Sequence, residues 1–307
     1  MNNYKIAILM ATYNGELYLQ EQLKSIKNQT LTNWDLWVSD DDSTDNTLSI
    51  LEEFKKEVST NNKVNIVRGP KKGSNSNFWS MVLNKDIKAD YFAFADQDDI
   101  WYEDKLEKGL SSILEKNIPL SLYCARTEIV NKEGEFQFYS PLFKLKPSFL
   151  NALVQSLAGG NTMIFSNHLR EYLMFIGLDN QIIAHDWLIY QIACGVGSEI
   201  IYDPIPKVKY RQHDKNLIGS NIGFFSRMNR IYKLLNGSFK NWNDCNLKIL
   251  YILYDQFTDE SKKHVKYFEK MRSNYFFKLK NLFNVRIYRQ TFLGNIALII
   301  SIYINRL

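Results

Sequence analysis

The sequence lacks the features that define several large classes of protein. Its 307 residues include three cysteines without CxxC spacing, so we expect neither a disulfide framework nor a zinc site. No GxxxxGK string occurs, which disfavours a P-loop kinase or ATPase. The first residues lack the long apolar core and cleavage site of a secretory signal, so we expect a protein of the reducing cytoplasm.

Acidic residues are scarce near the C-terminus. Residues 1–222 hold 23 basic and 28 acidic residues, a net charge of −5, whereas residues 223–307 hold 15 and 5, a net charge of +10. The acidic first part argues against nucleic acid as a partner of the whole chain. The asymmetry predicts a first domain over residues 1–222 and a basic region, helical by its apolar spacing, over residues 223–307.

A long apolar run is also missing from the basic region. Residues 292–304 are apolar but are interrupted by Gly294 and Asn295, and a spanning helix needs about 20 apolar residues. Basic and aromatic side chains interleave just before this segment, which suits an anionic membrane surface. Packing on the first domain, or contact with a second subunit in a homodimer, explains the segment equally well.

Four short apolar runs are typical of buried strands. They are residues 6–10, 34–38, 64–67 and 91–95. The segments between them have helical apolar spacing, so the pattern predicts an α/β fold with a doubly wound sheet of parallel strands. Further elements are expected at residues 106–114 (helix), 120–125 (strand), 161–165 (strand), 185–193 (helix) and 208–211 (strand).

Polar residues follow each of the four predicted strands at its carboxyl end. They lie at residues 12–15, 40–42, 68 and 96–99. The carboxyl ends of parallel strands meet at one edge of an open α/β sheet, which is where such sheets bind ligands. Capping of the helices that follow is the alternative interpretation.

The clearest local signal is the string DQDDIW at residues 96–101. Carboxylates held close together raise one another's pKa unless a cation neutralises them. Oxygen ligands suit Mg²⁺ or Mn²⁺, which complete their coordination with phosphate and water. An acidic loop that caps the helix beginning near Leu106 is the alternative.

Three strings together resemble the family 2 glycosyltransferases with the GT-A fold: residues 11–15 (ATYNG), 39–45 (SDDDSTD) and 96–101. With residues 185–187 (HDW) and 210–213 (YRQH), the chain is similar to bacterial rhamnosyltransferases of cell-surface polysaccharide synthesis. The resemblance covers residues 5 to about 217. It implies a GT-A mixed sheet flanked by helices, a catalytic domain over residues 1–222 and a helical C-terminal extension.

The resemblance also implies residues for a nucleotide-sugar donor and a metal ion. Those expected at the donor are Thr12, Tyr13, Asn14, Asp41, Arg68, Lys72 and Asp96. Asp41 would accept a hydrogen bond from the pyrimidine ring, and Asp96 would lie near the ribose. The metal motif is Asp96 and Asp98, with Asp98 as the direct ligand and Asp99 as a substitute for a neighbour. His213 is expected as a further ligand, with a structural histidine as the alternative. Asp42 stands where the family more often has glycine.

Asp186 matches the catalytic base of the family. A carboxylate suits this role because an acceptor hydroxyl attacks only as its proton is removed. Attack opposite the leaving diphosphate inverts the anomeric centre. The alternative is an aspartate that caps a helix. Gly160, Asn161 and Trp187 are expected to contact the acceptor, with a tight turn and a core tryptophan as the alternatives.

The resulting prediction is a Mn²⁺- or Mg²⁺-dependent inverting transfer of L-rhamnose from dTDP-L-rhamnose to a hydroxyl of a saccharide, expected to be lipid-linked. It places the protein in the cytoplasm, at the inner face of the cell membrane. A UDP-hexose donor is the first alternative. A nucleotidyltransferase is less favoured because residues 10–16 contain no glycine-rich basic loop, and a non-catalytic sugar-nucleotide-binding protein is the third interpretation.

Overall fold

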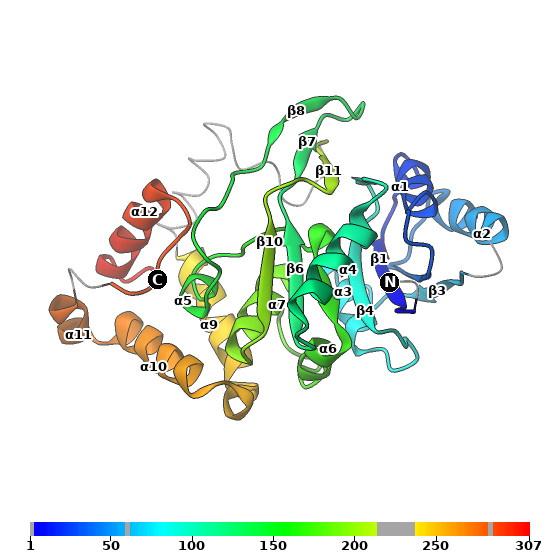
Figure 1. The fold of residues 1–307 in the computed structure, drawn as a ribbon. Coiled ribbons are helices and arrows are strands. Elements are labelled where there is room, and N and C mark those ends of the chain that lie inside the picture. Colours follow the sequence, from blue (N-terminus) through cyan, green and yellow to red (C-terminus); the bar gives the residue numbers. More distant parts are fainter. Residues whose placement is uncertain (1–2, 59–61, 214–236, 282–284) are drawn as a thin grey trace.

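A computed structural model describes residues 3–58, 62–213, 237–281 and 285–307, and it contains a central sheet with helices on both faces (Figure 1). The strand order in this sheet is β10-β6-β9-β4-β1-β2-β3. Its strands are β1 (Ile6–Thr12), β2 (Trp34–Asp40), β3 (Val64–Arg68), β4 (Tyr91–Asp96), β6 (Ser121–Ala125), β9 (Ile164–Ser166) and β10 (Glu199–Asp203). The first four strands are parallel, whereas β9 runs antiparallel between β4 and β6, so the predicted mixed α/β sheet is confirmed.

Helices cover both faces of the sheet because the central strands are apolar on both sides. Along β1, Ile8 and Met10 pack into one buried cluster, and Ala7 and Leu9 pack into the other. This two-sided burial explains why the strand is a continuous apolar run rather than an alternating one. The helices of this part are α1 (Leu19–Lys27), α2 (Thr47–Glu57), α3 (Ser74–Leu83), α4 (Lys105–Lys116), α5 (Phe149–Ala152), α6 (Asn167–Leu173) and α7 (His185–Gly195), with the 3-10 helix η1 (Gly160–Thr162).

A second, four-stranded sheet was not predicted. It has the order β5-β11-β7-β8, with β5 (Ile100–Trp101), β7 (Glu128–Val130), β8 (Phe136–Tyr139) and β11 (Val208–Arg211). β11 matches the strand predicted at residues 208–211, whereas the other three are only two to four residues long, too short for a clear period-2 pattern. Because β5 directly follows the DQDD turn and pairs with β11, this sheet brings the end of β11 to that turn.

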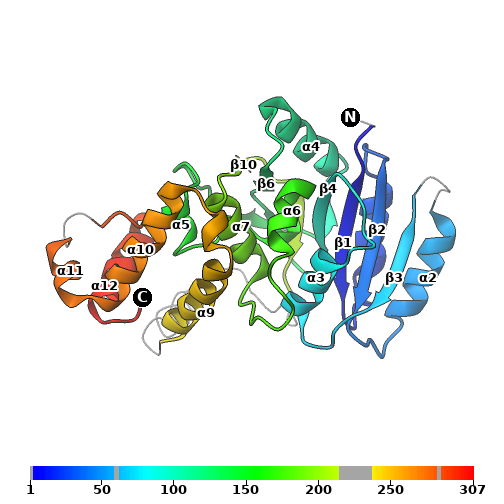
Figure 2. The same ribbon diagram turned by 90° about the horizontal axis from the view of Figure 1, so that it is seen from below.

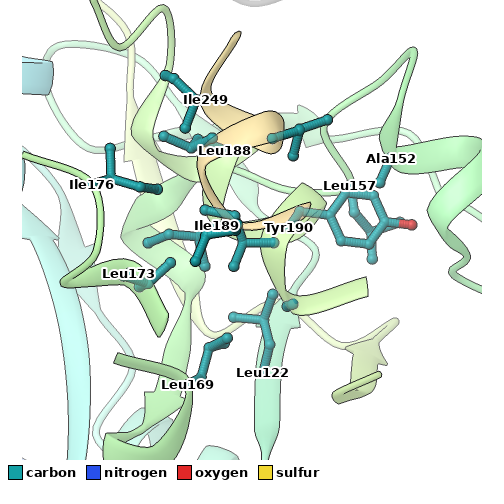
Figure 3. Close-up of a cluster of buried hydrophobic side chains, with 14 of the residues drawn as sticks. Leu122, Ala152, Leu157, Leu169, Leu173, Ile176, Leu188, Ile189, Tyr190 and Ile249 are labelled. Atoms are coloured by element: carbon teal, nitrogen blue, oxygen red, sulfur yellow. The ribbon is translucent and has the colours of Figure 1, made fainter. Parts of the chain in front are cut away.

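The basic C-terminal region is helical, as predicted, and lies at the end of the molecule opposite β3 (Figures 1 and 2). Its elements are α9 (Ser238–Ile252), the 3-10 helix η2 (Tyr254–Gln256), α10 (Asp259–Ser273), α11 (Tyr275–Lys280) and α12 (Phe292–Tyr303). Ile249 of α9 joins Leu188 and Ile189 of α7 in one buried cluster (Figure 3). The C-terminal helices therefore share a core with the sheet. The predicted boundary between residues 222 and 223 lies outside the described residues. Among the described residues, no helix is long and apolar enough to cross a membrane.

The connection between α3 and β4 depends on one buried arginine of α6. Arg170 is 3% exposed, and its guanidinium donates to the carbonyl oxygens of Val82 and Ile87, each at 2.7 Å, and of Asn84. It also lies over the Phe92 ring, 4.5 Å from the centroid. A planar group with several fixed donors can satisfy this turn, whereas an ammonium group cannot reach all three acceptors.

We expect Arg170→Lys to lower the free energy of unfolding by about 2–4 kcal/mol, because buried carbonyl groups lose donors. Urea denaturation monitored by circular dichroism measures the effect. Arg286→Lys, at an exposed position, is the matched control and should stay within about 0.5 kcal/mol of the wild type. Equal stability of the two variants would contradict the role of Arg170.

Candidate active site

The strand register brings the predicted polar strand ends to one edge of the sheet. Thr12 lies beside Asp40, Asp40 beside Arg68, and Ala11 beside Asp96. The loops after β1, β2, β3 and β4 therefore start side by side. Helix capping explains only part of this edge. The N-cap residues of α1, α2 and α4 make no side-chain capping hydrogen bond, but the Asp45 carboxylate accepts from the amide of Thr47, the first residue of α2, at 3.0 Å.

Asp40, which was not predicted as a site residue, organises the loop after β2. Its carboxylate is 6% exposed and accepts hydrogen bonds from the Thr12 hydroxyl at 2.8 Å and from the Ser43 amide and hydroxyl at 2.8 and 2.6 Å. Thr12 is 1% exposed. Its hydroxyl is therefore engaged with Asp40 and supports that carboxylate, while a contact of Thr12 with the donor stays a prediction.

Tyr13 and Asn14 form the loop after β1. Asn14 adopts a φ of +48°, and its side-chain oxygen accepts a hydrogen bond from the Thr44 amide at 2.9 Å. Gln97 clamps the backbone of Tyr13, accepting from its amide at 2.9 Å and donating to its carbonyl at 3.0 Å. The Tyr13 ring is 58% exposed at this edge, where it can stack on a planar group.

Asp41 and Asp42 tie the loop after β2 to the loop after β3. The Asp41 carboxylate accepts from the Lys71 amide at 2.7 Å and from the Gly73 amide at 3.0 Å. Each of its oxygens still has a free lone pair for a ligand donor. Asp42 has a φ of +76°, the conformation that explains the frequent glycine of the family, and its carboxylate pairs with the Lys71 ammonium at 2.8 Å. The side chains of Arg68 and Lys72 are exposed near the same loop.

Carboxylates converge at the end of β4. Burial, followed by the charges of Asp98 and Asp186, raises the pKa of Asp96 to about 7, so both carboxylates lie near enough to Asp96 to disfavour its ionised form. Asp98 and Asp186, separated by 88 positions in the chain, therefore share one site with Asp96. This convergence agrees with the predicted acidic site.

Asp99 lies beneath this cluster rather than in it. It is 0% exposed, and it accepts from the side-chain amide of Asn161 and from the Arg211 backbone amide, the latter at 3.3 Å. Burial, together with the charges of Asp98 and Asp96, raises its pKa well above the ordinary value. Its carboxylate is committed to the interior, which argues against its suggested role as a substitute metal ligand.

Lys105, which was not predicted as a site residue, is the buried basic residue of the site. It is 0% exposed, and its ammonium lies 3.2 Å from the centroid of the Trp101 ring. Burial lowers its pKa well below the ordinary value, while the charges of Asp99 and Asp96 oppose that shift. A lysine in the first turn of a helix is common, so the sequence did not distinguish Lys105 from an ordinary surface lysine. Its proximity to both carboxylates is a consequence of the fold.

His213 lies directly against the acidic cluster. Its Nε2 is 2.8 Å from an Asp98 carboxylate oxygen, and its ring stacks on Tyr18 with centroids 4.9 Å apart. The guanidinium of Arg211 also lies over the Tyr18 ring, 4.6 Å from its centroid. It donates to the Asp98 carbonyl oxygen at 3.1 Å and to the Glu21 carboxylate. Asp98 and His213 therefore meet as the sequence predicted.

These residues fit a divalent cation as a partial set of ligands. Within the described residues, no group of three His, Cys, Asp or Glu side chains is arranged to enclose a metal. Asp98 and His213 offer two possible ligand atoms 2.8 Å apart, and the charges of Asp98 and Asp186 add to the burial that raises the pKa of Asp96. Mg²⁺ and Mn²⁺ suit such a site because substrate phosphates and water supply their remaining ligands.

Asp186 is held at the start of α7 by contacts with α3. Asn75 of α3 accepts from the His185 amide at 3.1 Å and donates to the Ile183 carbonyl at 2.9 Å. The His185 ring packs on Phe78, with centroids 4.4 Å apart, and burial lowers its pKa to about 3, so it is neutral. These contacts fix the backbone that carries the carboxylate.

The pKa of the Asp186 carboxylate is higher than that of an ordinary aspartate. Burial raises its pKa to about 6, although the Trp187 amide, which donates to it at 2.7 Å, opposes the shift. A pKa near neutrality suits a group that accepts a proton during the reaction and releases it afterwards. Because Trp187 lies in the first turn of α7, the same contact shows that Asp186 also satisfies a free amide at the helix start, as the alternative prediction stated.

The three residues expected at the acceptor are buried. A Cβ on Gly160 would lie 2.3 Å from Nε2 of His185, so glycine allows the close approach of that ring. Asn161 is 3% exposed and donates to Asp99, and Trp187 is 6% exposed with its indole nitrogen donating to the Ala152 carbonyl at 2.6 Å. The structure thus gives them supporting positions under the site, and Trp187 is the core residue of the stated alternative.

Known proteins are similar to this chain in sequence and in fold. Residues 7–173 match the model of glycosyl transferase family 2. The dTDP-rhamnosyl transferase RfbG of Shigella flexneri is 33% identical over 239 residues, which cover 72% of this chain and 78% of that protein. The UDP-Glc:alpha-D-GlcNAc-diphosphoundecaprenol beta-1,3-glucosyltransferase WfgD of Escherichia coli is 33% identical over 134 residues, or 44% of this chain and 50% of that protein.

Solved structures agree in fold at low identity. S. aureus TarS 1-349 in complex with UDP-GlcNAc has a TM-score of 0.55 at 18% identity and covers 82% of this chain and 73% of that chain. The mannosyltransferase PcManGT from Pyrobaculum calidifontis, in complex with GDP-Man and Mn²⁺, has a TM-score of 0.53 at 13% identity and covers 99% and 88%. Together with the family model, which spans more than half of the chain, these likenesses show that the chain belongs to glycosyltransferase family 2 and is a glycosyltransferase of the GT-A fold.

Proposed function

We propose that this glycosyltransferase moves L-rhamnose from dTDP-L-rhamnose to a hydroxyl group of a saccharide, with inversion at the anomeric carbon. The observation that carries the reaction type is the convergence of Asp186 with Asp96 and Asp98 at the carboxyl edge of the sheet. The rhamnosyl donor is supported by the similarity to the Shigella flexneri dTDP-rhamnosyl transferase. We assign this catalytic function to residues 1–222.

In this proposal the loops after β1 and β2 bind the nucleoside. The exposed Tyr13 ring stacks on the base, and Asp41 accepts from the pyrimidine N–H through a lone pair that its backbone contacts leave free. Asn14 holds the two loops together through its contact with the Thr44 amide. Arg68 and Lys72 lie at the same edge with exposed side chains and can approach the diphosphate.

Asp98 and His213 would hold a Mn²⁺ or Mg²⁺ ion, with Asp96 beside it toward the ribose. The ion, when bound, supplies positive charge to the leaving diphosphate. A Mn²⁺ ion is present in the PcManGT complex, whose fold is similar. Lys105 lies behind the carboxylates and opposes part of their negative charge from the buried side.

Asp186 is the proposed general base. Its carboxylate removes the proton of the acceptor hydroxyl as oxygen attacks the anomeric carbon from the side opposite the diphosphate. The contacts of Asn75 and His185 hold the carboxylate in one position, so that little reorganisation is needed. The proton stays on Asp186 during the transfer and then passes to solvent, which restores the carboxylate.

We infer a lipid-linked saccharide as the acceptor, and a location in the cytoplasm at the inner face of the cell membrane. The name of the Escherichia coli relative specifies an acceptor on diphosphoundecaprenol, which supports this inference. The same name specifies UDP-Glc as donor, and TarS was solved with UDP-GlcNAc. A UDP-hexose is therefore the second candidate donor, and a panel of nucleotide sugars with the purified protein distinguishes the two.

Asp186→Asn should lower the rate of sugar transfer by about 10²–10⁴-fold, because an amide cannot accept the proton. Nucleoside diphosphate binding, measured by isothermal titration calorimetry, should change little. Asp179→Asn, the same substitution at an exposed position, is the matched control and should transfer sugar at the wild-type rate. Wild-type transfer by Asp186→Asn would remove the proposed base.

The transfer rate at saturating substrate and Mg²⁺ should fall as the pH is lowered through about 6. Asp186 accepts a proton only in its ionised form, which is the minor form below its pKa. The bound cation favours the ionised form of Asp96, and His185 is neutral throughout this range. A rate that stays constant from pH 7 to about pH 5 would be inconsistent with Asp186 as the base.

Chelation with EDTA should abolish the release of nucleoside diphosphate, and added Mn²⁺ or Mg²⁺ should restore it. Asp98→Asn and His213→Gln should each raise the metal concentration for half-maximal rate by about tenfold or more, because each removes a direct ligand. His168→Gln, at an exposed position on α6, is the control. Undiminished turnover in EDTA would rule out the metal requirement.

A further inference from the structure

The helix α12 is apolar on two opposite faces. Leu298 and Ile302, which are 2% and 1% exposed, pack into the large buried cluster. The other face points away from the protein. It carries Phe292 (80% exposed), Leu293 (68%), Ile296 (41%), Ile299 (40%), Ile300 (47%) and Tyr303 (38%).

The exposed side chains form one continuous stripe. Residues 292, 296, 299 or 300, and 303 follow one another at intervals of three or four, which places them in a row along one side of a helix. A helix that is apolar all round is normally covered on all sides. A contiguous apolar surface of this kind marks a site of contact with a partner or a membrane.

The charges around α12 identify the kind of partner. In the sequence, Arg286 and Arg289 precede the helix and Arg306 follows it, and no acidic residue occurs after Glu269. The guanidinium groups of Arg286 and Arg289 lie over the Tyr267 and Phe239 rings of the neighbouring helices. A second copy of the chain, docked through the same helix, would bring two basic regions together. An anionic lipid surface instead complements them and accepts the apolar side chains.

We propose that α12 docks the protein on an anionic lipid bilayer, lying in the plane of the headgroups with its exposed face toward the acyl chains. At 12 residues the helix is about 18 Å long, shorter than the hydrocarbon core of about 30 Å, so it lies on the membrane rather than across it. This surface is separate from the acidic site on the sheet. The inference therefore does not depend on the identity of the donor or on the proposed base.

Sedimentation with lipid vesicles tests the proposal with the full-length protein. The wild type should bind vesicles of phosphatidylcholine with phosphatidylglycerol, bind less at high salt, and bind weakly to phosphatidylcholine alone. Ile296→Glu with Ile300→Glu should weaken binding to the anionic vesicles by at least about tenfold, because two apolar side chains no longer enter the bilayer. The matched double control is Ile118→Glu with Ile205→Glu, at positions 41% and 57% exposed on other surfaces, and it should bind like the wild type.

Arg286→Glu provides a second variant that leaves the apolar face intact. It should also weaken binding to the anionic vesicles, and its effect should shrink at high salt. Circular dichroism and the release of nucleoside diphosphate from the donor in solution should match the wild type in all these variants. A wild type that releases no nucleoside diphosphate from the donor would contradict the proposed function, but it would leave the docking surface untouched.

Two results would overturn the proposal. The first is a wild type that does not bind anionic vesicles, or α12 variants that bind them as the double control does. The second is a wild-type dimer, measured by light scattering, that the α12 double variant converts to a monomer while vesicle binding is absent. That outcome would assign the face to a second copy of the chain.

Discussion

The negative charge gathered around the half-buried Asp96 is the main physical constraint on this protein. Asp96, Asp98 and Asp186 share one edge of the sheet, and burial together with their charges raises the pKa of Asp96 to about 7. Such a cluster is unfavourable unless positive charge lies nearby. The buried Lys105 lies near Asp96, but burial disfavours its own charged form, so a bound cation is the main source of positive charge that the site can accept.

Holding these groups together requires a rigid support, and buried polar side chains provide it. Asp40 and Asn14 fasten the loops after β1 and β2, and Gln97 fastens the first of these loops to the acidic turn. Asn75 holds the start of α7, and Arg211 joins the second sheet to the Asp98 backbone. Catalytic groups on loops are accurate only when such contacts fix them, which explains why so many polar residues are buried here.

The sequence predicted the parts of this arrangement that local patterns can encode. Long buried strands and helices give strong periodic signals, and strand ends in parallel sheets have a known common edge. The second sheet escaped prediction because its strands are short. Whether a polar residue faces the ligand or the interior depends on contacts between distant segments: Thr12 and Asn161 turn inward toward Asp40 and Asp99, and no local pattern distinguishes them from exposed neighbours.

The proposed reaction needs a cation that joins the acidic edge to a diphosphate, and a crystal grown with Mn²⁺ and a nucleoside diphosphate can locate that cation. The anomalous scattering of manganese identifies the ion in such a crystal. We predict a single strong peak in contact with the Asp98 carboxylate and the His213 imidazole, with the diphosphate on its open side and Asp186 facing the same space. A manganese ion bound elsewhere, or a diphosphate bound away from the end of β4, would contradict it.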